Sequence, residues 1–442
     1  MYNKWLDMYK SKLKTLDEAA AMIKDGEDVY CALGGGQPFG MFEAIGQRIR
    51  RGELAEVSLF AGNVIIPTAL TDPDIKERVH FDTPFVGPYT RQGNKEGFYT
   101  YSPIKLSDMD SISAQGLRKG DVYILRVAPM DKHGFFSTGI NVDYGWGMAK
   151  TNPERRMLIL EVNQHMPRTY GTNHIHITEA DIVAENHVLM PYVPDLPLTD
   201  VEISIGQHIA DMVPDGATIQ LGIGGIPNAV GKFLHDKRDL GVHSEMLTSC
   251  MLELYKAGVI TSAKKTFMPY KWIGSFAWGN QELYDFINEN PMIEMHTCGF
   301  VNNPYIIAKN DKMISVNSTL QLDLTGQCAS EAIGSYQFSG VGGQADFVQG
   351  AWLSKGGKSF IATPSTVQDK NGQLISKIVT SLDYGSFVST PRTETHWVVT
   401  EYGAVLVKGQ SIKKRAESLI SIAHPDFRDQ LRFEAKKLGF FS

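Results

Sequence analysis

This chain of 442 residues has few of the features that mark redox, metal-binding or membrane proteins. Its four cysteines lie far apart and form no CxxC pair: Cys31, Cys250, Cys298 and Cys328. We therefore expect reduced core thiols, without disulfides, a zinc site or another bound metal. No uninterrupted apolar run is long enough to span a bilayer, so a membrane is not an expected partner.

Positive charge is also scarce. The chain carries 43 Lys and Arg against 49 Asp and Glu, a formal net charge of -6, and its basic residues are scattered. Nucleic acid is therefore not an expected partner either. Residues 1–23 carry polar side chains at every third or fourth position, which is typical of an amphipathic helix rather than a signal peptide. We expect a cytoplasmic protein.

Several familiar catalytic motifs are missing. The stretch GGKS at 356–359 lacks the first glycine of a phosphate-binding loop, because Trp352 stands in its place. GVGGQA at 340–345 fits a loose dinucleotide pattern, but it follows a poor strand, and no acid that could bind a ribose follows at the expected distance. The chain has neither a GxSxG nucleophile elbow nor an HExxH motif. The common hydrolase machinery is thus absent, and a nicotinamide enzyme is a minor alternative.

Two similar segments are present instead, DGEDVYCALGGGQPFGMFEAI from Asp25 and DGATIQLGIGGIPNAVGKFL from Asp215. Each has a DG turn, a short β-prone run, a glycine cluster, a proline and a helix-like pattern. A second pair, APMDKHGFFSTG near Asp131 and QLDLTGQCASEAIG near Asp323, recurs at the same offset of about 190 residues. One such pair can arise by chance, but two pairs at one offset indicate a duplication.

The duplication predicts two related α/β halves, joined by the proline-rich segment VLMPYVPDLPLTDVE at 188–202. We place the domains at 1–190 and 200–442. β-prone runs such as DVYILRVA alternate with helical patterns such as AVGKFLHDKR, which predicts open, mostly parallel sheets covered by helices. Ligands of such sheets lie beyond the carboxyl ends of the strands, where GGGQP and GIGGIP stand.

Glycine-rich turns at strand ends can bring several backbone N–H groups to one point, which suits an anion or a developing oxyanion. Tight packing of a strand against a helix explains the same pattern without a ligand. A further cluster, FSGVGGQADF at 338–347, contains Gly340, Gly342 and Gly343. Its backbone must either turn sharply or let another group approach closely.

Four motifs of the second half, in their order and spacing, resemble the family I CoA-transferases: GIGGIPNAV (222–230), LGVHSEM (240–246), FSGVGGQADF and VVTEYG (398–403). Within that family the chain is most similar to the acetyl-CoA hydrolase and 4-hydroxybutyrate CoA-transferase branch, which EVNQHMPRTYG, SKIV and LISIAHPDF also resemble. The resemblance runs nearly end to end. It implies a tandem pair of open α/β domains.

The resemblance implies an enzyme in which a glutamate, matched here to Glu245 of HSEM, attacks an acyl-CoA thioester. An acyl-glutamyl anhydride forms first and an enzyme–CoA thioester second, and CoA then passes to another acid by ping-pong kinetics. The expected ligands are coenzyme A, as acyl-CoA, and a short-chain acid such as acetate, butyrate or 4-hydroxybutyrate. We also expect a homo-oligomer, a dimer or larger.

Three alternatives stay open. An acyl-CoA hydrolase would use the same site with water as the acceptor. Transfer to a dicarboxylic acid, such as succinate or itaconate, would need only a different acid pocket. A sensor protein on the same fold would bind acyl-CoA without turnover.

The resemblance also assigns site residues. The residues that would contact CoA are Gly222, Ile223, Gly224, Gly225, Ile226, Leu320 and Gly343. Asn302 matches an asparagine beside the reacting carbonyl, and Gln220 and Glu401 match residues near the glutamate.

The first half would shape the acid pocket, where Arg91 is the candidate partner of the incoming carboxylate. Gln37 belongs to the same pocket and stands where relatives often have an acid. LTSC follows Met246 where Asp-Gly is usual. These departures leave the identity of the acceptor acid open.

Overall fold

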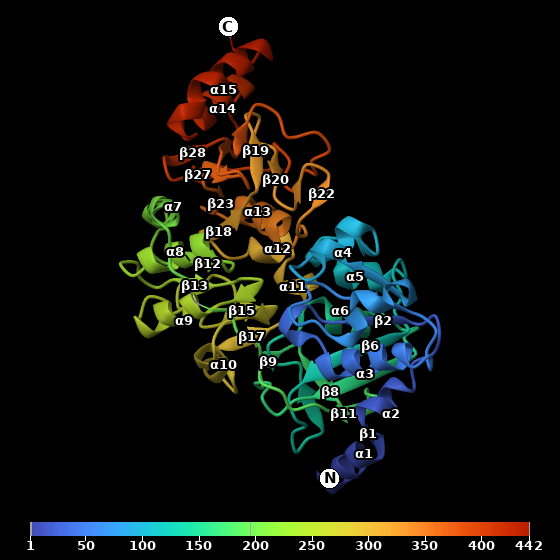
Figure 1. The fold of residues 1–442 in the computed structure, drawn as a ribbon. Helices are drawn as coiled ribbons and strands as arrows, with labels where there is room; N and C mark the ends of the chain where they lie inside the picture. Colours follow the sequence, from blue (N-terminus) through green and yellow to red (C-terminus); the bar gives the residue numbers. More distant parts are fainter. Residues whose placement is uncertain (1, 195, 442) are drawn as a thin grey trace. The chain divides into compact units, whose positions relative to one another are not determined.

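The structure, a computed structural model, describes residues 2–194 and 196–441. The chain forms two compact units, which Figure 1 colours along the sequence. The first unit contains the chain up to Val193 together with Ile273–Val301, and the second contains Pro194–Trp272 and the chain from Asn302 onward. In the part of the chain that the structure describes, no helix has both the length and the apolar character to cross a membrane.

An eight-stranded sheet forms the centre of the first unit, and all of its neighbouring strands are parallel. Its order is β1 (Leu13–Lys14), β11 (Ile182–Glu185), β8 (Met157–Val162), β6 (Val122–Val127), β2 (Asp28–Cys31), β3 (Val57–Phe60), β4 (Val79–Thr83) and β5 (Tyr99–Tyr101). The helices are α1 (Tyr2–Lys12), α2 (Leu16–Ala20), α3 (Phe39–Arg50), α4 (Arg91–Glu96), α5 (Met109–Ala114), α6 (Asp143–Thr151), α10 (Gln281–Ile287) and α11 (Cys298–Val301). Alternate strand residues such as Val29, Leu59 and Ile124 share one buried core with Phe42 and Ile45 of α3. Their burial packs the helices onto the sheet.

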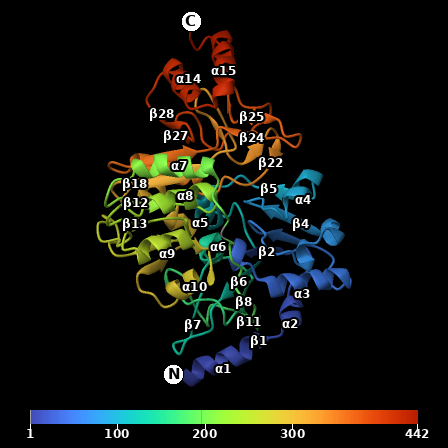
Figure 2. The same ribbon diagram turned by 60° about the vertical axis from the view of Figure 1, so that its left-hand side comes forward.

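The second unit has a six-stranded sheet that is parallel except for its last pair. Its order is β13 (Gly241–Val242), β12 (Thr218–Gln220), β18 (Met313–Ser318), β23 (Lys358–Ala362), β27 (Trp397–Thr400) and β28 (Gly403–Leu406). The helices are α7 (Asp200–Asp211), α8 (Gly225–Phe233), α9 (Ser249–Lys256), α12 (Pro304–Ile307), α13 (Gln344–Leu353), α14 (Ile412–Ser421) and α15 (Pro425–Lys437). In Figure 2, α7 and α8 pack side by side along this sheet. The prediction of mostly parallel sheets covered by helices is therefore confirmed.

Shorter strands complete both units. In the first, β7 (Phe135–Ser137) pairs with β10 (His174–His176), and β9 (Tyr170–Gly171) pairs with β17 (Ile293–Met295). In the second, β19 (Gln321–Asp323) pairs with β20 (Cys328–Ala329) and β26 (Ile378–Val379), β21 (Ala332–Ile333) with β22 (Tyr336–Gln337), and β24 (Thr366–Gln368) with β25 (Leu374–Ser376).

The two sheets share a strand order, which supports the duplication. The first contains β11-β8-β6-β2-β3 and the second contains β27-β23-β18-β12-β13. The two DG segments lie directly before β2 and β12, at equivalent places in this order. The second pair of similar segments follows β6 and β18 and contains β7 and β19. Each pair of similar segments therefore occupies equivalent positions in the strand orders of the two sheets.

The domain boundary drawn from the sequence needs one correction, because residues 273–301 lie in the first unit and not in a domain spanning 200–442. Their backbone partners are there. Glu294 of β17 pairs with Tyr170 of β9, and the Val142 N–H donates to the Ser275 carbonyl (3.0 Å). Thr297 Oγ1 also donates to the Asp110 carboxylate on α5 (2.6 Å). The chain therefore crosses from the second unit back to the first before it returns at Asn302.

Candidate active site

The predicted site residues of the second unit follow the carboxyl ends of parallel strands. Glu245 comes three residues after β13, Gly222–Ile226 follow β12, Leu320 follows β18 and Glu401 follows β27. Since parallel strands end at one edge of a sheet, the topology gathers these segments at that edge.

Glu245 lies between β13 and β14 (Met246–Leu247) and is half-buried. Asn302 Nδ2 donates a hydrogen bond to Glu245 Oε2 at 2.7 Å. Asn302 is completely buried, and its Oδ1 has no hydrogen-bond partner. An amide nitrogen carries two hydrogens, so one N–H of Asn302 orients the carboxylate and the second is available to another acceptor.

Gly343 completes this arrangement. It is the N-cap of α13, with a φ of -94° that any residue adopts. A Cβ at this position would lie 2.5 Å from Asn302 Nδ2 and closer still to Glu245 Oε2. The carboxylate of Glu245 thus approaches Gly343 closely, and Gly343 is required for space rather than for backbone conformation. That Gly343 also contacts CoA stays a prediction of the resemblance.

The glycine loop, defined as Gly222–Ile226, divides into two parts. Gly222 and Gly224 face open space, Gly224 has a φ of +111°, and Ile223 is 39% exposed. Gly225 instead packs against the Glu202 side chain of α7, so tight packing explains this glycine. The open part stands directly before α8, whose first N–H groups have no partner within the helix. Such a turn can hold an anionic or carbonyl oxygen.

The remaining predicted residues of this unit form hydrogen bonds with neighbouring strand ends. Leu320 is half-buried, and its N–H donates to the Ala329 carbonyl. Gln220 Oε1 accepts from the Val316 N–H (3.2 Å) and from Asn317.

Glu401 accepts a hydrogen bond from the Ser365 N–H (2.9 Å) and another from the Ser365 hydroxyl. Gln220 and Glu401 therefore join neighbouring strand ends. That both residues lie near Glu245 stays a prediction of the resemblance.

The predicted acid-pocket residues belong to the first unit. Gln37 follows β2 and is completely buried; its Nε2 donates to the Gly62 carbonyl (2.9 Å), and its Oε1 has no partner. Arg91 is half-buried at the start of α4, beyond the carboxyl end of β4. Both residues therefore follow strand ends of the same parallel sheet, with β3 between β2 and β4.

Asp143 is a functional candidate that the sequence patterns do not reveal. It is completely buried and accepts hydrogen bonds from the N–H groups of Leu33 (3.1 Å) and Gly145 (2.7 Å) and from Asn141 (2.9 Å). Burial raises its pKa to about 6. Through Leu33, Asp143 fixes the start of the GGGQP loop that carries Gln37.

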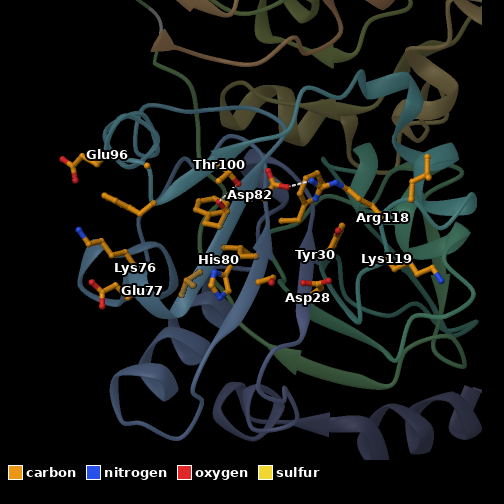
Figure 3. Close-up of a pocket in the computed structure, with 18 residues that line it drawn as sticks. Asp28, Tyr30, Lys76, Glu77, His80, Asp82, Glu96, Thr100, Arg118 and Lys119 are labelled. Carbon is orange, nitrogen blue, oxygen red and sulfur yellow. Dashed lines mark hydrogen bonds and ion pairs between the residues drawn. The ribbon is translucent and has the colours of Figure 1, made fainter. Parts of the chain in front are cut away.

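A separate hollow of about 960 Å³ lies on the face of β2–β5 in the first unit (Figure 3). Tyr30, Phe60 and Asp82 line it with Arg118, which forms an ion pair with Asp82 and stacks over the Phe60 ring at 4.6 Å. Neither Gln37 nor Arg91 belongs to this hollow. Acidic and basic side chains both line it, and we assign it no ligand.

Comparison with known proteins matches both parts of the chain to family models. Residues 3–194 match the acetyl-CoA hydrolase/transferase N-terminal domain, and residues 279–435 match the C-terminal domain of the same description. The chain is 41% identical to the 4-hydroxybutyrate coenzyme A transferase of Clostridium kluyveri, covering 98% of this chain and 99% of that protein. It is 39% identical to the butyryl-CoA:acetate CoA-transferase of Anaerostipes caccae, with 97% of each chain covered.

Solved structures agree with this result. RipA from Yersinia pestis is 36% identical, with a TM-score of 0.90 over 99% of this chain and 100% of that one. The 4-hydroxybutyrate CoA-transferase from Porphyromonas gingivalis is 33% identical, with a TM-score of 0.81 over 98% of this chain and 100% of that one.

Proposed function

The chain belongs to the acetyl-CoA hydrolase/transferase family and is a CoA-transferase, and from this premise we propose that Glu245 is its covalent nucleophile. The enzyme would move CoA between a short-chain acyl-CoA and an acid of the acetate, butyrate or 4-hydroxybutyrate type. The observation that supports this most is the contact of one carboxylate oxygen of Glu245 with both Asn302 and Gly343.

The proposed reaction has two balanced halves. The Glu245 carboxylate attacks the thioester carbonyl, the C–S bond breaks, and CoA leaves as the thiolate, which gives an acyl-glutamyl anhydride. The thiolate then attacks the glutamyl carbonyl of the anhydride, and the original acid leaves as a carboxylate. A second acid reverses these steps from the glutamyl-CoA thioester. No net proton is consumed, and ping-pong kinetics follow.

Each tetrahedral intermediate places negative charge on a carbonyl oxygen. The second N–H of Asn302, the Gly343 N–H and the N–H groups of the glycine loop are the donors that we assign to these oxyanions. One such donor is worth roughly 3 kcal/mol in the transition state. Leu320 would contact the pantetheine arm of CoA beside the glycine loop.

We further propose that Arg91 and Gln37 select the acid. Arg91→Ala should raise the KM of the acid much more than the KM of acyl-CoA, because only the acid loses charge-assisted hydrogen bonds. Steady-state kinetics with each substrate varied in turn measure the two constants. Arg51→Ala, which removes the same charge at the exposed end of α3, is the matched control. Equal rises in both constants for Arg91→Ala would place the carboxylate site elsewhere.

Product analysis tests the overall reaction. Butyryl-CoA and acetate should give acetyl-CoA, and butyryl-CoA alone should release little free CoA. Free CoA formed at the same rate with and without acetate would instead identify a hydrolase. Faster transfer to succinate or itaconate would identify a dicarboxylic acceptor, and binding of butyryl-CoA without any turnover would identify a sensor.

The site of action and the assembly stay predictions. We propose the cytoplasm, because all four cysteines are free and Cys31, Cys298 and Cys328 are buried as thiols. A homo-oligomer of two or more chains is the expected assembly, which sedimentation equilibrium would measure.

A further inference from the structure

Ser244 directly precedes Glu245 and is completely buried. Its hydroxyl lies 2.7 Å from the Met246 carbonyl and 3.2 Å from the Leu221 carbonyl. A hydroxyl has one hydrogen to donate, so the two carbonyls share it. Met246 follows Glu245, and Leu221 precedes Gly222, so this one side chain contacts the backbone on both sides of the proposed chemistry.

His243, which directly precedes Ser244, also holds this segment in place. The imidazole is completely buried, its Nδ1 lies 3.2 Å from Asn310 Nδ2, and its ring packs edge-on against Phe347 of α13 at 6.2 Å. Since the amide nitrogen of Asn310 can only donate, Nδ1 accepts and the imidazole is assigned the Nε2–H tautomer. Because Phe347 lies on the first turn of the helix that Gly343 caps, His243 fixes Glu245 relative to Gly343.

We propose that Ser244 is a positioning residue that holds the Glu245 carboxylate in register with the open part of the glycine loop. This inference rests on the proposed role of Glu245 as nucleophile. The attacking oxygen and the loop N–H groups must both reach the same thioester carbonyl, and an error of about 1 Å in such an arrangement can cost a factor of 100. By binding the carbonyl groups of Leu221 and Met246, the Ser244 hydroxyl sets the spacing between the Glu245 carboxylate and the N–H groups of the glycine loop.

Burial alone does not explain a hydrogen-bonded serine here. Ser315 of β18 and Ser359 of β23 are also completely buried in this sheet, and neither hydroxyl has a hydrogen-bond partner. The sheet therefore accommodates buried serines without using their hydroxyl groups. At Ser244 the hydroxyl is used, and its two acceptors are the residues adjacent to Gly222 and Glu245.

Ser244→Ala tests the proposal, with Ser359→Ala as the matched control that removes a buried hydroxyl without a hydrogen bond. Purified full-length variants are mixed with butyryl-CoA without acceptor acid, and intact-mass spectrometry follows the CoA adduct over time. We expect Ser244→Ala to form the adduct about 10-fold or more slowly per folded molecule, with a KM for acyl-CoA within about twofold of the wild type. Ser359→Ala should match the wild type.

A purely structural role predicts a lower melting temperature with unchanged adduct rate per folded molecule, and that result would overturn the proposal. Ser244→Cys retains a weak hydrogen-bond donor, so it should form the CoA adduct faster than Ser244→Ala. This second variant keeps the proposal testable if Ser244→Ala folds poorly. An equal slowing of Ser244→Cys and Ser244→Ala would also count against it. If the wild type itself forms no adduct, the proposed function fails; if it does and Ser244→Ala forms it equally fast, only the role of Ser244 fails.

Discussion

Glu245→Gln is expected to lower kcat by about four orders of magnitude or more, because it removes the proposed nucleophile while keeping the shape of the side chain. The glutamine carbonyl can still accept the hydrogen bond from Asn302 Nδ2, so the fold and the site geometry should persist. A near-normal melting temperature together with lost turnover is the expected result.

The covalent intermediate gives a direct readout of the same change. Wild-type enzyme with acyl-CoA and no acceptor should carry one CoA on Glu245, in a thioester that borohydride reduces and hydroxylamine cleaves. Glu245→Gln should carry none. Glu253→Gln, the same substitution at an exposed position of α9, should behave as the wild type. A CoA adduct on another residue would contradict the assignment.

Gly343→Ala should cut turnover by about two orders of magnitude or more, the scale of one lost oxyanion donor. The new methyl group would occupy the space of the Glu245 carboxylate oxygen. That oxygen is the far end of a flexible side chain, so the carboxylate can rotate away and the protein can still fold. The carboxylate would then leave Asn302, and the reacting carbonyl would lose its approach to Gly343.

Gly258→Ala is the control with the opposite expected profile. Gly258 follows Ala257, the C-cap of α9, with a φ of +76°, and a Cβ added there would meet open space. Alanine there should cost about 1 kcal/mol of stability through backbone strain and leave turnover per folded molecule unchanged. Melting temperature and kcat measured on both variants separate the two effects. If Gly343→Ala melted several degrees lower yet turned over normally, Gly343 would be only a structural turn residue.

Much of the fold could be predicted from the sequence, because its signals are local and repeated. The DG turns at Asp25 and Asp215 precede matching strands, and the glycine clusters mark the carboxyl ends of those strands. The return of 273–301 to the first unit could not be predicted in this way. It depends on short contacts such as the pairing of the three-residue β17 with β9, and such strands carry little periodic pattern.

Less of the candidate site than of the fold could be predicted from the residues alone. A single glutamate after a short strand, such as Glu245, looks like many solvated loop residues, and only the resemblance of HSEM to a family motif distinguished it. The structure adds that Asn302 and Gly343 contact its carboxylate. Ser244 could not be found from a pattern, because its importance lies in the carbonyl groups that its hydroxyl reaches.

The return of the chain at Ile273–Val301 also sets the order in which the protein can fold. During synthesis the first unit is incomplete until residue 301 has been added. By then the residues that form β12 and β13 of the second unit have already been synthesised. A fragment that ends at Val193 would leave β9 without its partner β17 and the half-buried Asp110 carboxylate without the hydroxyl of Thr297. Closing this long loop has an entropic cost that slows folding. Each unit has a core of its own, but the nascent chain cannot finish one before it has begun the other.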